Sequence, residues 1–98
     1  MVPRNHPSEC TLCRKKRLLE FHHLIPRKIH RRTFYRRNFT RKELNIGIWI
    51  CRFCHLGLHK IYSEMELAKN FHDLERLRKD PKIQRHVTWA KKQKTAEV

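Results

Sequence analysis

The sequence predicts a small α+β domain in which two short strands and several helices are held together by a metal site. The chain has only 98 residues, so we expect one domain with a small hydrophobic core. Only 39% of the residues are hydrophobic, and a core of this size benefits from a disulfide or a bound metal. Two pairs of cysteines could supply that link, and two short apolar segments between helical patterns supply the strands.

The first half of the chain carries the expected strands. Leu18 to Ile25 is apolar-rich with rough alternation, which predicts a strand that Pro26 ends. Thr40 and Glu43 have the spacing of a capping box, so a short helix is expected from Arg41 to Asn45. Residues 48–50 are β-branched and aromatic, which predicts the second strand.

Helices are expected from there to the end of the chain. One should follow the second strand from Arg52 to Tyr62, although Gly57 disfavours it by about 1 kcal/mol relative to Ala. A capping box beginning at Ser63 and apolar residues at helical spacing predict a helix that reaches Lys79. Asp80 and Pro81 then open a last helix. The expected core positions of these two helices are Leu67, Phe71, Leu74, Leu77, Ile83, Val87 and either Trp89 or Ala90.

Within a single domain of residues 1–98, we therefore expect a Cys/His core over residues 10–62 and a helical C-terminal extension over residues 63–95. The N-terminal segment has no apolar stretch typical of a signal peptide, and no apolar run reaches the length of a spanning helix. We expect a cytoplasmic protein without a membrane partner.

The charge balance indicates a polyanionic partner. The chain has 24 Lys and Arg against 9 Asp and Glu, which gives a formal net charge of +15. Eight basic residues and no acidic ones lie in residues 27–42, with aromatic residues between them. Such a run is often just a solvated face. We interpret it as a surface that follows the phosphates of a DNA duplex with little sequence specificity, through Arg27, Lys28, Arg31, Arg32, Arg36, Arg37, Arg41 and Lys42.

The cysteines form two knuckles, Cys10-x-x-Cys13 and Cys51-x-x-Cys54. Each knuckle can offer two thiolates to one tetrahedral Zn²⁺, so we expect a structural zinc held by all four. The alternative is a pair of disulfides or buried free thiols, which is less typical of a basic intracellular chain.

Four of the eight histidines suggest a second metal site. His55 and His59 are four residues apart on an expected helix and therefore share one face. His22 and His23 are neighbours on an expected strand and point to opposite sides, so one can join the ion while the other is free to act as a base. Alternatively, these histidines only pack in the core or face solvent. We expect the remaining ones to be solvated or to face phosphates: His6, His30, His72 and His86.

The order of these motifs resembles the HNH endonucleases of the four-cysteine type, which are ββα-metal, treble-clef-like nucleases. The resemblance covers the two knuckles, the Phe21 to Pro26 segment, Asn45 and the His55-x3-His59 pair. The helical tail is also similar to that of a small bacterial HNH subfamily, so a bacterial or phage-infected cell is the expected setting.

The resemblance implies a role for each residue. His23 would be the general base, His22 and His55 ligands of a catalytic divalent ion (Mg²⁺, Mn²⁺, Ni²⁺ or Zn²⁺), and His59 a third ligand or a phosphate contact. Asn45 would orient the ring of His23 or hold its loop. Asn38 competes with Asn45 for that role, and Asn45 could equally be a helix C-cap.

The expected activity is metal-dependent hydrolysis of DNA phosphodiester bonds by an endonuclease or nickase. A neutral imidazole can activate water, and a divalent ion can stabilise the phosphate and the leaving oxygen. Two alternatives remain. One is a non-catalytic zinc-binding nucleic-acid module, and the other is a recruitment factor whose C-terminal helices dock a protein complex such as phage packaging machinery.

Overall fold

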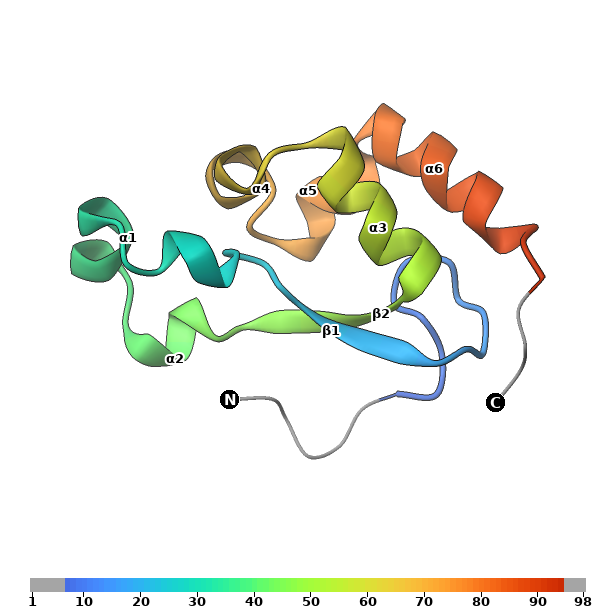
Figure 1. Ribbon diagram of the computed structural model, residues 1–98, viewed down its shortest axis with the longest axis horizontal. Coiled ribbons are helices and arrows are strands. Elements are labelled where there is room, and N and C mark those ends of the chain that lie inside the picture. The colour runs from blue at the N-terminus through green and yellow to red at the C-terminus, as the bar shows by residue number, and fades with distance from the viewer. Residues whose placement is uncertain (1–6, 95–98) are drawn as a thin grey trace.

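A computed structural model describes residues 7–94, and the expected contact of His6 lies outside them. A two-stranded antiparallel sheet runs through the middle of the chain's fold, and the C-terminal helices lie on one side of it (Figure 1). The elements are β1 (Leu19–His23), the 3-10 helix η1 (Arg27–Ile29), α1 (Thr33–Asn38), α2 (Arg41–Leu44), β2 (Gly47–Cys51), α3 (Arg52–Ile61), α4 (Glu64–Asn70), α5 (Leu74–Lys79) and α6 (Pro81–Lys91). The predicted small α+β class is confirmed.

The sheet pairs β1 with β2 so that Leu19 lies opposite Cys51 and His23 opposite Gly47. A close approach explains the glycine, because a Cβ at Gly47 would lie 2.4 Å from the carbonyl oxygen of His22. Helix α3 begins directly after β2 and turns back over the sheet (Figure 1). It therefore runs in the same direction as β1.

Several helix boundaries follow from their caps. Thr40 and Ser63 both form the expected capping boxes, at the starts of α2 and α4. The side chain of Asp80 accepts a hydrogen bond from the backbone N–H of Ile83, with Pro81 at the first helical position of α6. Local capping chemistry thus determines where these helices begin.

Two helices differ from the prediction. The helix expected to continue to Lys79 is interrupted after Asn70, because the side chain of Asp73 caps a new helix, α5, by accepting from the N–H of Arg76. The basic stretch contains α1, which we did not predict. Its N-cap residue, Arg32, provides no side-chain hydrogen bond, so the sequence carries no capping signal for this helix.

The buried residues form two clusters. The larger joins the four cysteines to the sheet and to α3, α5 and α6, and includes Ile50, Leu58, Leu77 and Ile83. Of the two alternatives for the last helix, Ala90 is the buried one and Trp89 is exposed. The smaller cluster packs η1, α1 and α2 against α4 through Ile25, Ile29, Tyr35, Leu44 and Ala68. Within residues 7–94 no helix has the length and apolar composition needed to cross a membrane.

Candidate functional site

The four cysteines come together at one end of the sheet. Cys10 and Cys13 precede β1, Cys51 ends β2, and Cys54 lies in the first turn of α3. All four are buried free thiols, and their sulfur atoms lie within 4.8 Å of one another. The cluster can therefore hold a metal ion, and four sulfur donors at this spacing fit a structural zinc.

The four thiols differ in their electrostatic environment. Burial raises the pKa of Cys13 to about 11. Hydrogen bonding to Cys10 and Cys51 raises the pKa of Cys54, whereas hydrogen bonding to Cys10 and Cys54 lowers that of Cys51. Four thiolates in this buried volume would require a positive ion to neutralise them.

Arg17 supplies one positive charge to this cluster. Its side chain is buried, and its Nη1 atom lies 3.6 Å from the Sγ of Cys13 and 3.7 Å from that of Cys51. The same atom donates to the carbonyl oxygen of Ala90 at 2.8 Å, and Nη2 donates to that of Gln93. One guanidinium therefore links the cysteine cluster to the C-terminal end of α6.

A second group forms where β1 and α3 run side by side. Leu19 at the start of β1 pairs with Cys51, the N-cap residue of α3. Distances along the strand and along the helix can therefore both be measured from this pair. His22 lies three residues along β1, or about 10 Å. His55 and His59 lie about 6 and 12 Å along α3 from Cys51. His22 therefore lies at a height along the two elements between those of His55 and His59. One ring nitrogen of each of these three histidines lies within 4.8 Å of one ring nitrogen of the other two.

His22 is the buried member of this trio. Its exposed fraction is 2%, and its Nε2 atom has no hydrogen-bond partner within residues 7–94. Burial, together with the neighbouring charges of His55 and His59, lowers its pKa to about 3. The ring is therefore neutral at ordinary pH, and a buried, unpartnered imidazole nitrogen fits a metal ligand.

Glu20 orients a second member of the trio. Glu20 and His22 are two residues apart on β1 and so share one face of the strand. The Nδ1 atom of His55 donates to Oε1 of Glu20 at 2.8 Å. This bond fixes the tautomer of His55 and leaves its Nε2 as the unprotonated nitrogen. Carboxylate support of this kind is typical of metal-binding histidines.

His23 has a different environment from the trio. Its Nε2 atom is also buried and has no hydrogen-bond partner in the described part of the chain. Burial lowers the pKa of His23, and the charge of His30, whose ring centroid is 5.6 Å away, lowers it further. Hydrogen bonding with the Asn45 side chain raises that pKa in part. The ring is thus set apart from the trio as a neutral group.

Asn45 combines two of the expected roles. It is the C-cap residue of α2, and its Nδ2 atom donates to the carbonyl oxygen of Arg41 at 3.0 Å. Its side chain also acts on His23. Asn38, the competing residue, instead donates to the carbonyl oxygen of Phe34 at 2.7 Å within α1.

One cavity of about 220 Å³ joins these histidines. His22, His55 and His59 line it together with His23. The other lining residues are Phe21, Pro26, Arg27 and Glu64. A cation and a carboxylate therefore accompany the four imidazoles, so the cavity offers both metal ligands and a contact for an anion.

The eight basic residues of the 27–42 stretch are exposed, and they lie on η1, α1, α2 and the turns between them. Lys28 forms an ion pair of 3.6 Å with Glu64. Arg27 lines the histidine cavity. The basic stretch thus begins at the cavity and continues through α1 and α2, two helices that lie beyond one end of the sheet (Figure 1).

Three other histidines, expected to be solvated or to face phosphates, are half-buried and each bonds a backbone carbonyl oxygen. His30 donates from Nε2 to the carbonyl oxygen of Ile25 at 2.6 Å, and His72 from Nδ1 to that of Ala68 at 3.1 Å. His86 bonds the carbonyl oxygen of Phe53 and packs against α3. Each ring is paired to a backbone group that lies next to it only in the folded chain.

Comparisons with known proteins leave the family open. No family model matches the chain, and no solved structure matches it. The uncharacterized protein YisB of Bacillus subtilis (strain 168) is 39% identical over 44 residues, which are 45% of this chain. The match spans 44% of that protein, so the chain covers less than half of its relative.

Proposed function

We propose that the chain is a metal-dependent HNH endonuclease or nickase that hydrolyses phosphodiester bonds of DNA with low sequence specificity. The observation that supports this most directly is the cavity lined by His22, His23, His55 and His59. Three of these rings form a ligand group, and the fourth is a separate neutral imidazole. A metal-dependent hydrolase needs both.

In this proposal His22, His55 and His59 hold the catalytic ion. Their fit rests on the unpartnered Nε2 of His22 and on the carboxylate that orients His55. When bound, a divalent ion supplies charge stabilisation to the scissile phosphate and the leaving oxygen. The buried, neutral state of His22 keeps its lone pair available as a ligand.

His23 is the general base of the proposal. Its lowered pKa keeps the ring neutral near pH 7, so a ring nitrogen can accept the proton of the attacking water. Nε2, which lacks a partner among the described residues, is the atom we assign to this transfer. Asn45 acts through His23 by holding the ring, so it is a positioning residue.

The basic residues would place the DNA. Arg27 lines the cavity and would contact the phosphate next to the scissile one. The exposed cations of α1 and α2 continue from there and would hold the backbone through charge alone. Contacts with phosphates carry no sequence information, which supports low specificity.

The arrangement of the core supports the ββα-metal, treble-clef-like assignment. One knuckle precedes β1, the other joins β2 to α3, and the histidines project from β1 and α3. The structural zinc would hold the start of β1 and the start of α3 together, so that the strand and the helix run side by side from there. It would thereby set the spacing of the histidine group.

Plasmid cleavage tests the proposal. Supercoiled plasmid is incubated with the zinc-loaded protein and each of Mg²⁺, Mn²⁺, Ni²⁺ and Zn²⁺, and conversion to nicked or linear DNA is followed on gels. We expect cleavage with at least one ion and none without an added ion. If the folded protein binds the plasmid but cleaves it with none of the four ions, the non-catalytic nucleic-acid module or a recruitment factor replaces this proposal.

A further inference from the structure

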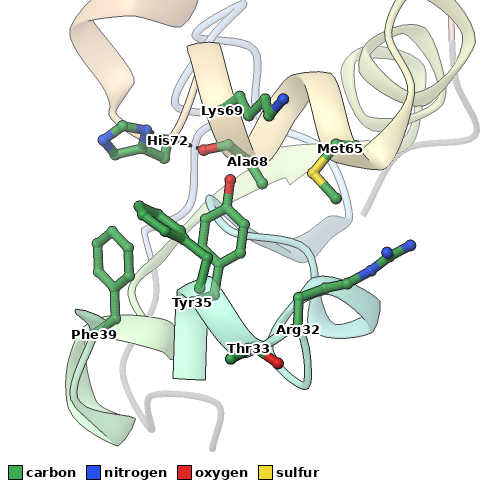
Figure 2. A pocket seen from close by; sticks show the side chains of 9 residues that line it. Arg32, Thr33, Tyr35, Phe39, Met65, Ala68, Lys69 and His72 are labelled. Atoms are coloured by element: carbon green, nitrogen blue, oxygen red, sulfur yellow. Dashed lines mark hydrogen bonds between the residues drawn. The ribbon is translucent and has the colours of Figure 1, made fainter. Parts of the chain in front are cut away.

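A second, larger cavity lies between α1 and α4, away from the histidine site. Its volume is about 650 Å³, which is in the range of ligand-binding cavities. Figure 2 shows Arg32, Tyr35 and Phe39 on one side and residues of α4 on the other. The full lining is Arg32, Thr33, Phe34, Tyr35, Phe39, Met65, Ala68, Lys69 and His72.

Aromatic rings dominate this lining. The rings of Tyr35 and Phe39 stack with centroids 5.7 Å apart and planes 18° apart. Phe34 stands at right angles to Tyr35 with centroids 5.1 Å apart, and 62% of it is exposed. Because the Phe34 ring is exposed beside the stacked pair, it is accessible to a flat ligand that enters the cavity. Unpaired nucleobases are such ligands, because they stack on aromatic side chains.

The charge around the cavity favours an anionic ligand. Arg32 and Lys69 line it, and both are exposed. Each of its nine lining residues is neutral or basic. Arg36 directly follows Tyr35 in the chain, Arg31 directly precedes Arg32, and both are exposed as well. An aromatic floor with a cationic rim is complementary to a planar base attached to phosphates.

His72 adds a polar group to the apolar wall. Its Nδ1 atom donates to the carbonyl oxygen of Ala68 at 3.1 Å, so Nε2 is the acceptor nitrogen of the neutral ring. This acceptor suits an N–H group of a base, such as the N3–H of thymine or the amino group of adenine. Polar atoms of this kind select a base over a purely apolar ligand.

From these contacts we propose that the cavity between α1 and α4 binds an unpaired base of a DNA strand, while the neighbouring cations hold its phosphates. The inference deepens the proposed nuclease function and rests on it for the choice of DNA. It predicts that the preferred substrate has single-stranded character, as in a flap, gap or loop. Because the cavity is distinct from the histidine site, binding can be tested without cleavage.

The test compares three fluorescent 12-nucleotide ligands without added catalytic metal: a thymidine single strand, an abasic strand of equal charge and a blunt duplex. Fluorescence anisotropy gives the affinity of the wild type, of Phe34→Ala and of Phe34→Trp. Leu18→Ala is the control, because Leu18 is 70% exposed and lies elsewhere. A strand with one 2-aminopurine reports stacking through quenching.

We expect Phe34→Ala to weaken thymidine-strand binding roughly 5- to 150-fold, the range for loss of one stacked base. Affinity for the abasic strand should not change, the salt dependence should keep its slope, and Phe34→Trp and Leu18→Ala should bind as the wild type does. Quenching of 2-aminopurine should disappear in Phe34→Ala.

Two results would overturn the proposal. One is an equal loss of affinity for the thymidine and abasic strands. The other is no loss for either strand, which is the result expected if the cavity binds an apolar peptide. Absence of cleavage in the plasmid assay would leave this binding result intact, so the two proposals fail separately.

Discussion

The Oε1 atom of Glu20 accepts a hydrogen bond of 2.8 Å from the Nδ1 atom of His55, across the gap between β1 and α3. This contact joins the strand that carries His22 to the helix that carries the other proposed ligands. No local sequence pattern distinguishes Glu20, so the sequence alone does not predict this contact. The contact depends on the register of the sheet and on the path of α3.

Glu20→Gln should weaken binding of the catalytic ion about 10- to 100-fold, since supporting carboxylates contribute this much to metal affinity. Titration of the zinc-loaded protein with Mn²⁺ or Ni²⁺ by calorimetry measures the change. Glu43→Gln is the control, because Glu43 is exposed and forms the capping box of α2. Unchanged affinity in Glu20→Gln would show that this carboxylate does not serve a metal ligand.

Arg17→Ala should lower the free energy of unfolding by about 2–3 kcal/mol, because a buried guanidinium that bonds charged and carbonyl groups is lost. Denaturant unfolding measures this loss, with the exposed Lys15→Ala as control. Elemental analysis should still find one zinc per chain, and a chelator should remove it faster than from the wild type. Equal stability of the two variants would contradict the role assigned to Arg17.

Gly57 allows α6 to approach α3, since a Cβ there would lie 2.0 Å from the Nε2 atom of His86. Gly57→Ala should therefore destabilise the fold by about 1 kcal/mol, although Ala is the better helix former. In a His86→Ala background the same change should be neutral or stabilising. A double-mutant cycle by thermal or denaturant unfolding measures this coupling, and additive effects would contradict the packing.

The pH dependence of cleavage should reflect the environment of His23. Burial lowers its pKa, so the base stays neutral, and activity should rise with pH with a midpoint below the ordinary histidine value of 6.5. Asn45→Ala should shift the rise to still lower pH, because the Asn45 contact raises that pKa. His30→Gln should shift it upward, because the charge of His30 lowers the pKa. Profiles of kcat at saturating metal measure the shifts, and a common midpoint for all three proteins would exclude His23 as the titrating group.

Local patterns predicted much of the fold but little of the arrangement around the site. The cysteine spacing, the β-branched run before Cys51 and the capping residues Thr40 and Ser63 are local signals, and each corresponds to an observed feature. Helix α1 has no side-chain cap, so no such signal existed. The contacts of Arg17 and of His86 join residues far apart in the chain, and only packing determines them.

The division of roles among the histidines is the central claim, and one comparison tests it most directly. Plasmid cleavage and Mn²⁺ binding are measured side by side for the wild type, His23→Ala and His55→Ala, after elemental analysis shows one zinc in each. We predict that His23→Ala binds Mn²⁺ as the wild type does but cleaves at least about 100-fold more slowly, as expected for loss of a general base. His55→Ala should lose both cleavage and Mn²⁺ affinity. Full cleavage by His23→Ala, or Mn²⁺ binding by His55→Ala equal to that of the wild type, would contradict the account.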